Sequence, residues 1–163
     1  MPAFSAFCVA APRSGEGKTT AAMALCRALR ERGVAVEAFK CGPDYVDPTF
    51  LATASGRRAL NLDTWLMGEN GVRRIFARAG RQAGVCVVEG VMGLFDGRGP
   101  GDLSGSTLDC ARVLGLPVIL TVNVRGMAAS ITPLVAGFLD SARRHGVRIA
   151  GVLAQNAGSE RHT

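Results

Sequence analysis

The chain has 163 residues, of which 48% are hydrophobic, so it fits one domain with a buried core. No apolar run approaches the ~18–20 residues that a membrane-spanning helix needs, and the first residues lack the pattern of a signal peptide. The net charge of +6 invites a nucleic-acid interpretation, but one Trp and one Tyr leave little aromatic surface for stacking on bases. We expect a cytoplasmic protein with no membrane and no nucleic-acid partner.

The five cysteines are an odd number, and no two of them form a C-x-x-C pair. Cys8, Cys26 and Cys86 fall within strand or helix patterns, so we expect buried free thiols rather than disulfides or metal ligands. Reduced thiols are typical of cytoplasmic proteins.

Apolar runs alternate with helical segments along the chain. The expected strands are residues 4–10, 34–39, 85–89, 118–122 and 149–154. The expected helices are residues 19–32, 48–55, 70–79, 107–114 and 128–144. The glycines that follow these helices, as C-terminal caps would, are Gly33, Gly80, Gly84, Gly115 and Gly146. Because the strands are short, rich in Val and Ile and barely alternate, they predict an α/β fold with a doubly wound, mainly parallel sheet and helices on both faces.

A glycine-rich segment joins the first expected strand to the first expected helix. Its candidate phosphate-binding residues are Arg13, Ser14, Gly15, Glu16, Gly17, Lys18, Thr19 and Thr20. In such a loop the glycines turn backbone N–H groups toward phosphate oxygens, the lysine reaches the β- and γ-phosphates, and the threonine after it holds Mg²⁺. Pro12 stands where the usual pattern has its first glycine, and a structural turn is the alternative. The strand before the loop and the helix after it favour binding of ATP or GTP in a P-loop NTPase-like fold.

The distribution of lysines singles out a second position. Of 19 basic residues only Lys18 and Lys40 are lysine, and Lys40 follows the second expected strand. A compact ammonium is not interchangeable with a planar guanidinium where one phosphate oxygen must be met. Lys40 is therefore a site candidate.

Acidic residues also follow the second and third expected strands, where ligands bind in sheets of this kind. Glu89 closes an apolar strand, the place where an acid commonly completes the Mg²⁺ shell that the loop threonine begins. Asp44 and Asp47 lie beside prolines and Asp96 precedes a glycine, so turn or helix-cap roles are the alternatives for these three.

Three longer strings resemble one family. They are Lys40-Cys41-Gly42-Pro43-Asp44-Tyr45-Val46-Asp47-Pro48 with Asn61-Leu62-Asp63, Glu89-Gly90-Val91-Met92-Gly93-Leu94-Phe95-Asp96-Gly97, and Arg125-Gly126-Met127-Ala128-Ala129-Ser130. They are similar to the ATP-dependent synthetase domain of cobyrinate a,c-diamide synthases, in the dethiobiotin-synthetase-like branch of P-loop proteins. The resemblance covers essentially the whole chain and implies amidation of the a and c acetate groups of a corrinoid substrate with ATP, Mg²⁺ and glutamine. Relatives that act on hydrogenobyrinate or nickel-sirohydrochlorin are not separated by these motifs.

The resemblance also implies roles for single residues. Thr19, Asp44 and Glu89 would hold the metal, and Lys40 would lie at the γ-phosphate. Substrate would contact Asp47 and the backbone of Gly90, Val91, Met92 and Gly93. Asp96 would orient substrate or ammonia, and Asn156 would read the adenine edge. Arg13 takes the place of the extra lysine of deviant Walker loops, although a surface arginine at the loop edge fits equally well.

The same family leads us to expect a glutamine amidotransferase domain that residues 1–163 do not contain. We therefore expect a truncated synthetase domain, with a homodimer as a further option. Asn123 stands where relatives often carry Asp, which puts a carboxylate role there in doubt. Two rival interpretations remain at this point: a deviant-Walker ATPase switch of the partitioning or metal-insertion type, and a non-catalytic basic binding module.

Overall fold

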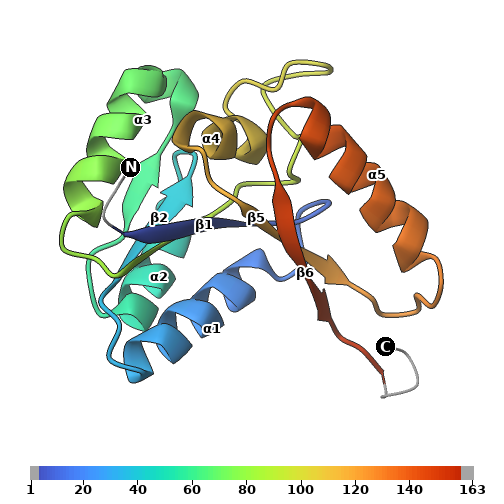
Figure 1. Ribbon diagram of the computed structural model, residues 1–163, viewed down its shortest axis with the longest axis horizontal. Helices are drawn as coiled ribbons and strands as arrows, with labels where there is room; N and C mark the ends of the chain where they lie inside the picture. The colour runs from blue at the N-terminus through green and yellow to red at the C-terminus, as the bar shows by residue number, and fades with distance from the viewer. Residues whose placement is uncertain (1–3, 159–163) are drawn as a thin grey trace.

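The computed structural model describes residues 4–158. Its centre is a six-stranded sheet in the order β3-β2-β4-β1-β5-β6, and every pairing between these strands is parallel (Figure 1). The strands are β1 (Ser5–Ala10), β2 (Val36–Cys41), β3 (Leu60–Leu62), β4 (Val85–Glu89), β5 (Val118–Asn123) and β6 (Ile149–Gln155). The predicted α/β fold is confirmed, and each strand ends at the same edge of the sheet.

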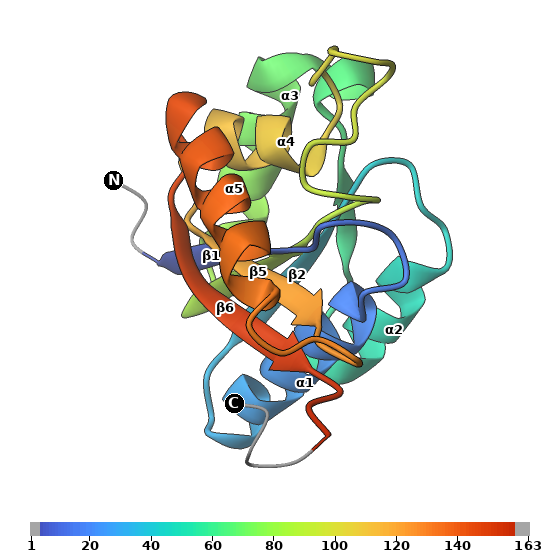
Figure 2. The same ribbon diagram turned by 90° about the vertical axis from the view of Figure 1, so that its right-hand side faces the viewer.

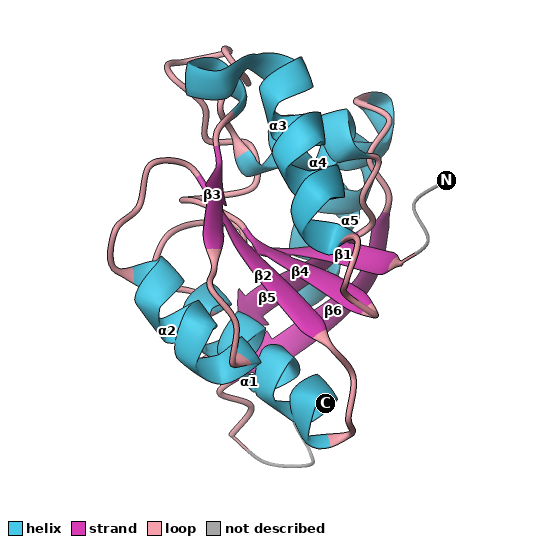
Figure 3. Ribbon diagram, turned by 90° about the vertical axis from the view of Figure 1, so that its left-hand side faces the viewer, coloured by secondary structure: helices cyan, strands magenta, loops and turns pink. Residues whose placement is uncertain are grey.

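Five helices cover the two faces of the sheet. They are α1 (Lys18–Glu31), α2 (Asp47–Ser55), α3 (Thr64–Gly80), α4 (Thr107–Leu114) and α5 (Ile131–Arg144). Helices α1 and α2 pack on one face around Val9, Leu51 and Val87, and helices α3, α4 and α5 lie over the other (Figures 1 and 3). Every residue of β2 is buried, which explains why its sequence does not alternate between apolar and polar residues.

Most predicted elements are shifted by up to three residues at an end, and two differ more than that. β3 was not predicted because it has only three residues, too few to give a pattern. α3 begins at Thr64 rather than residue 70, because the Asp63 carboxylate accepts hydrogen bonds from the N–H groups of Trp65 and Leu66 and caps the helix. Gly68, with φ 65° and ψ 165°, kinks α3 just after this first turn and interrupts the helical periodicity.

The prediction of glycine caps is correct for three glycines and wrong for two. Gly33, Gly115 and Gly146 have positive φ values after α1, α4 and α5. Gly80 is the last residue of α3, and the space where its Cβ would lie is filled by the ring of Phe4. Gly84 follows a short turn and its N–H donates to Ala35 O at 2.8 Å. Close packing, not a left-handed cap, therefore explains Gly80.

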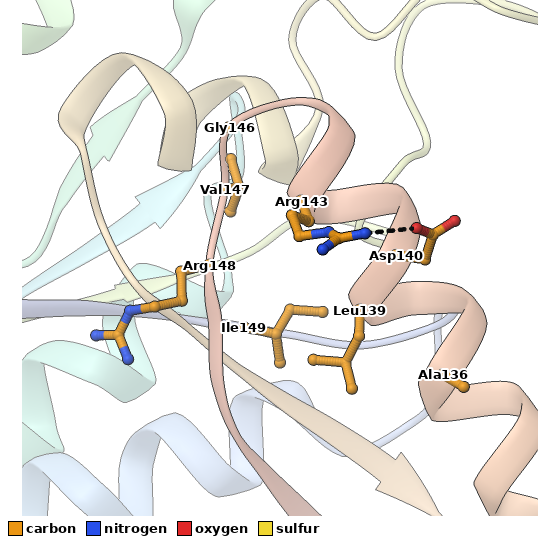
Figure 4. A pocket seen from close by; sticks show the side chains of 8 residues that line it. All are labelled: Ala136, Leu139, Asp140, Arg143, Gly146, Val147, Arg148 and Ile149. Atoms are coloured by element: carbon orange, nitrogen blue, oxygen red, sulfur yellow. Dashed lines mark hydrogen bonds and ion pairs between the residues drawn. The ribbon is translucent and has the colours of Figure 1, made fainter.

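The β6 edge of the sheet is covered far less completely than its centre. Ala142 is the only buried residue of α5, and Val152 and Leu153 of β6 are exposed. A cavity of about 700 Å³ lies between this helix and strand (Figure 4). Its lining residues are Ala136, Leu139, Asp140, Arg143, Gly146, Val147, Arg148 and Ile149.

All five cysteines are buried free thiols, as predicted. Burial raises the pKa of Cys26 and of Cys86 to about 12, so neither is a nucleophile at neutral pH. Within residues 4–158 no helix combines the length and the apolar character that crossing a membrane requires.

Candidate functional site

The phosphate loop occupies residues 11–17, between the end of β1 and the start of α1. Gly15 and Gly17 have φ values of 79° and 76°, a left-handed conformation that a side chain at either position would strain. Lys18 Nζ lies 3.4 Å from Arg13 O, so the ammonium folds back over the loop. Burial lowers the pKa of Lys18, and the nearby charge of Lys40 lowers it further. The loop has the geometry of an anion site at a helix N-terminus.

Glu16 fastens this loop to the neighbouring strands. The side chain is buried, and its Oε1 accepts from Arg13 Nε at 2.7 Å while its Oε2 accepts from Asn123 N at 2.5 Å. From β6, Gln155 Nε2 donates to Glu16 O at 3.2 Å and to Gly17 O at 3.1 Å. Glu16 therefore has a structural role in the loop, and the Arg13 guanidinium is engaged with it although the side chain is 77% exposed. The sequence analysis missed Gln155, since nothing in the sequence links residues so far apart.

A cavity of about 490 Å³ opens over the phosphate loop. The predicted site residues that line it are Ser14, Gly15, Gly17, Lys18, Thr19, Thr20, Lys40, Asp44, Asp47, Glu89, Val91 and Met92. The loops after β1, β2 and β4, which carry these residues, lie on one side of the molecule (Figure 2). The fold thus brings together residues from three separate stretches of the chain.

Four polar side chains form a connected group at the floor of this cavity. Thr19 Oγ1 donates to Glu89 Oε1 at 2.6 Å, and Lys40 Nζ lies 3.0 Å from the same oxygen. Lys40 Nζ also pairs with Asp47 Oδ2 at 2.6 Å and donates to Gly90 O at 3.0 Å. The three donors of this ammonium thus have three acceptors within the protein. Lys40 holds the ends of β2 and β4 together through charge.

Burial and ion pairing act in opposite directions on the pKa values of this group. Burial raises the pKa of Glu89, and this effect outweighs the hydrogen bond from Thr19 and the charge of Lys40. Burial also pulls the pKa of Lys40 down, but the ion pairs with Asp47 and Glu89 outweigh it, so that pKa lies above its ordinary value. The second oxygen of Glu89, Oε2, is buried with no hydrogen-bond partner in residues 4–158. An unpartnered buried carboxylate oxygen is costly, and a cation would compensate it.

The residues present suit Mg²⁺ bound together with a nucleotide. Thr19 supplies a hydroxyl and Glu89 a carboxylate with a free oxygen, while Asp44 lines the same cavity. In the described part of the chain no cluster of three or more His, Cys, Asp or Glu residues is arranged to hold a metal by itself. Mg²⁺ commonly keeps several waters and binds through one or two carboxylates and the phosphates of the substrate.

Asp44 shapes the loop after β2. Its Oδ1 accepts hydrogen bonds from Val46 N at 2.8 Å and Asp47 N at 3.0 Å. Partial burial pushes the pKa of Asp44 up, but these backbone donors outweigh it and hold the pKa below its ordinary value. Asn61 Nδ2 donates to Gly42 O at 2.9 Å and Asp44 O at 2.6 Å, which secures the same loop from β3. The turn role that the sequence allowed for Asp44 is thus present in the structure.

The loop after β4 uses most of its own backbone donors. Gly90 N donates to Val9 O at 2.8 Å, Val91 N to Thr107 Oγ1 at 2.8 Å, and Gly93 N to Asp96 Oδ2 at 2.7 Å. Three of the four amides from Gly90 to Gly93 are therefore engaged within the protein, and contact of this backbone with substrate stays a prediction. Met92, exposed and with φ 46°, is the one whose N–H has no acceptor among residues 4–158. Asp96 secures the turn through Gly93, and Thr107 is a supporting residue that the sequence analysis missed.

Asn156 lies just after β6, where the sequence analysis placed it. It is exposed with φ 58°, and its Nδ2 donates to Asn123 Oδ1 at 3.1 Å. This contact joins the ends of β5 and β6 beside the phosphate loop. That Asn156 recognises the edge of the adenine base stays a prediction.

The cavity between α5 and β6 has a different character. Its centre is formed by Leu139 and Ile149, and its one ion pair joins Asp140 to Arg143 at 3.5 Å on the exposed surface (Figure 4). None of the predicted site residues lies there. The buried charges therefore favour the phosphate loop over the larger cavity as the candidate functional site.

The chain resembles known proteins over most of its length. The sequence profile described as "CobQ/CobB/MinD/ParA nucleotide binding domain" matches residues 7–163. The chain is 48% identical over 154 residues to a cobyrinate a,c-diamide synthase of Syntrophotalea carbinolica, covering 94% of this chain and 33% of that protein. It is 47% identical over 164 residues to a hydrogenobyrinate a,c-diamide synthase of Mycobacterium tuberculosis H37Rv, covering 97% of this chain and 35% of that protein. The chain thus spans about a third of the length of these relatives.

The fold has solved counterparts at low sequence identity. The kinase domain of the Escherichia coli tyrosine kinase ETK superposes with a TM-score of 0.65 at 12% identity, covering 95% of this chain and 70% of that one. This likeness confirms the fold. The match over residues 7–163 shows that the chain belongs to the CobQ/CobB/MinD/ParA nucleotide binding domain family.

Proposed function

We propose that this chain is the ATP-dependent part of an a,c-diamide synthase that acts on cobyrinate or hydrogenobyrinate in cobalamin synthesis. The observation that carries the proposal is the Thr19–Glu89–Lys40 group under the phosphate loop, with one buried Glu89 oxygen left unpartnered. The identity to a,c-diamide synthases over 94% and 97% of this chain supports the choice of substrate class. The family profile supports a nucleotide as the cofactor.

The proposed reaction overcomes the low reactivity of a carboxylate. A carboxylate oxygen of the corrinoid attacks the γ-phosphorus of ATP, the bond to the β-phosphate oxygen breaks, and ADP leaves. Ammonia then attacks the carbonyl carbon of the acyl phosphate, phosphate leaves, and loss of a proton gives the amide. Positioning and electrostatic stabilisation are the protein's main contributions to phosphoryl transfer.

The phosphate-loop side of the cavity supplies the positive charge. Lys18 and the loop amides meet the phosphates, since Lys18 now contacts only a backbone carbonyl, at 3.4 Å. Thr19 Oγ1 and Glu89 Oε1 lie 2.6 Å apart and Asp44 lines the same cavity, so these three residues would hold Mg²⁺. Mg²⁺ would offset the charge that develops on the transferred group.

Lys40 and the loop after β4 supply orientation. Lys40 bridges Asp47 and Glu89, so it fixes both carboxylates and lowers the negative charge that an incoming phosphate meets. The free N–H of Met92 is the backbone donor available to a substrate carboxylate, with Asp96 holding the turn that presents it. We therefore place the acceptor carboxylate between Met92 and Lys18.

The nitrogen donor is ammonia in this proposal, delivered by a glutamine amidotransferase domain or partner. Glutamine hydrolysis requires a cysteine activated by a neighbouring base. Within residues 4–158 every cysteine is buried, and the one histidine, His145, lies at the C-terminal cap of α5, far from the phosphate loop in sequence.

The test is an assay of residues 1–163 with ATP, Mg²⁺ and cobyrinate, with ammonium in one set and glutamine in another. We expect phosphate release that depends on the corrinoid, and a product whose mass shows amidation with ammonium but not with glutamine. Phosphate release that ignores the corrinoid would instead support an ATPase switch. Glutamate formed from glutamine would refute the assignment of the nitrogen donor.

A further inference from the structure

Exposed apolar side chains gather beyond the phosphate cavity, at the edge where β2, β3 and β4 end. Tyr45 is 89% exposed, Trp65 56% and Met92 44%. Tyr45 follows β2, Trp65 follows β3 and Met92 follows β4, and these three parallel strands are neighbours. Their loops therefore meet at one edge, on the side that Figure 2 shows. We name Tyr45, Trp65, Met92 and the neighbouring Arg98 the carboxyl-edge patch.

The pair Trp65 and Arg98 is the most ordered part of this patch. The Arg98 guanidinium carbon lies 4.3 Å from the centre of the Trp65 ring, a cation–π arrangement. Arg98 is exposed and makes no ion pair with any carboxylate of residues 4–158. An unpaired guanidinium thus lies over one face of an exposed aromatic ring at the surface.

Several hydrogen bonds fix the backbone beneath this pair. Asp63 accepts from Trp65 N at 2.9 Å, and Thr64 Oγ1 donates to Asp109 Oδ2 at 2.6 Å. Gly105 N donates to Thr64 Oγ1 at 3.2 Å, and a Cβ at Gly105 would lie 3.8 Å from Trp65. A rigid aromatic anchor loses little entropy when it binds a ligand.

We propose that the carboxyl-edge patch binds the macrocycle of the corrinoid, an inference that rests on the proposed function. The nucleotide fills the cavity over the phosphate loop, so the large macrocycle has to lie outside it, next to Met92. Trp65 packs against the apolar face of the macrocycle, and Arg98 pairs with one of its peripheral carboxylates. The reacting acetate group then points past Met92 toward Lys18. A polycarboxylate macrocycle is the class of ligand that uses both an apolar surface and an unpaired cation.

The chain carries its own reporter for this proposal, because Trp65 is its single tryptophan. A corrinoid that packs on the indole should quench its fluorescence. The experiment titrates the chain with cobyrinate in the presence of MgADP and corrects for absorbed light with free N-acetyltryptophanamide. Calorimetry gives the Kd for variants that lack the reporter.

We expect Trp65→Ala and Arg98→Ala each to raise the corrinoid Kd about tenfold, while Trp65→Phe, which keeps a flat ring, raises it less. The Kd for ATP should not change in any of them. The matched control is Arg78→Ala, which removes an exposed cation from the opposite end of α3. Circular dichroism and thermal melting establish that each variant is folded.

The outcomes separate this inference from the function on which it rests. Corrinoid binding with an unchanged Kd in both Trp65→Ala and Arg98→Ala would overturn the patch and leave the proposed function standing. A folded protein that binds ATP but no corrinoid at all would overturn the proposed function. If the wild type self-associates and Trp65→Ala abolishes this without affecting the corrinoid Kd, the patch is an interface between two copies, and the inference is wrong.

Discussion

The centre of the sheet, where the phosphate site lies, and its β6 edge differ in what they bury. At the phosphate loop, Lys40 and Glu89 are 3% and 0% exposed and take part in one network of hydrogen bonds. At the β6 edge, Val152 and Leu153 are exposed, and the charged side chains, the Asp140 pairs of α5 and Arg148, lie at the surface. The larger cavity, about 700 Å³ against 490 Å³, belongs to the β6 edge. Cavity size is thus a poor guide to function here, and buried charge is the better one.

The reason lies in the cost of burying charge. The attraction within a buried ion pair is often smaller than the free energy needed to desolvate its two groups, so such a pair is weak evidence for stability. The Lys40–Glu89 pair also leaves Glu89 Oε2 without a partner. Such an arrangement is understandable where a metal and a phosphate complete it. Each prediction below sets a buried or nearly buried residue of the phosphate site or of the rest of the domain against a matched, more exposed residue near β6.

The largest expected effect contrasts Lys18→Ala with Arg143→Ala. Removal of Lys18 leaves phosphate charge uncompensated, so ATP affinity should fall about a hundredfold or more, while circular dichroism shows an intact fold. Arg143, the exposed cation of the other cavity, should be replaceable without loss of affinity. Calorimetric titration with MgATP measures both, and equal affinities of the two variants would remove the distinction between the cavities.

The next contrast concerns carboxylates. Glu89→Gln keeps the shape and removes the charge, so Mg²⁺-dependent turnover should fall by about a hundredfold or more while nucleotide binding largely survives. Asp140→Asn makes the same change in the cavity beside β6 and should leave turnover as it is. The measurement is phosphate release at limiting Mg²⁺. A wild-type rate for Glu89→Gln would show that Glu89 is only an acid at the end of a strand.

A third contrast tests packing rather than chemistry. Leu120 of β5 is fully buried, so Leu120→Ala should lower the free energy of unfolding by about 2–5 kcal/mol. Leu153 of β6 is 38% exposed, and Leu153→Ala should cost about 1 kcal/mol or less. Urea unfolding of both variants measures these losses in the free energy of unfolding. Similar losses would mean that the β6 edge is packed more tightly in solution than the structure shows.

The smallest expected effect is on how the free energy of unfolding depends on pH. Burial opposes ionisation of Asp109, but hydrogen bonds from Thr64 and Arg112 outweigh it, so its pKa lies below 3.8 in the folded state. The carboxylate therefore contributes stability above its unfolded-state pKa and loses it as the pH falls through the folded-state value. Asp109→Asn should cost about 1 kcal/mol at neutral pH, and its difference from wild type should shrink on acidification.

Asp140→Asn is the matched change near β6 for this prediction as well. Its side chain is 43% exposed against 14% for Asp109, and solvent screens its pairs with Arg143 and Arg144. We expect a smaller loss of unfolding free energy at neutral pH. Urea midpoints measured over a pH series give both values, and a constant difference between Asp109→Asn and wild type at all pH values would contradict the assignment.

Much of the fold follows from local sequence. The predicted bounds of β4 and α4 match the structure, because Val85–Glu89 is a continuous apolar run and Thr107–Leu114 lies between a serine N-cap and a glycine. The sequence does not reveal β3 or the start of α3. The three residues of β3 are too few to show a strand pattern, and the kink at Gly68 interrupts the helical pattern of α3. The same limit applies to Gly80, which is a glycine because the ring of Phe4, near the N-terminus, fills the space that a Cβ would need.

The sequence by itself determined the chemistry that the site contains. A glycine-rich loop between a strand and a helix, an acid at the end of an apolar strand and two lysines among many arginines are local patterns, and each reflects the properties of the residues concerned. It also determined that these residues would share one edge, since parallel strands all end on the same side of a sheet.

Only the tertiary structure decided how those residues meet. Lys40 on β2 meets acceptors at the start of α2 and at the end of β4, and Gln155 on β6 donates to the phosphate loop after β1. The burial of Glu89 Oε2 without a partner likewise depends on how these segments pack. The tertiary structure also decided that only Met92, among the four residues from Gly90 to Gly93, keeps a free N–H group in the described chain. Distances between residues far apart in the chain depend on strand order and register, which the packing of the whole domain sets and no local pattern encodes.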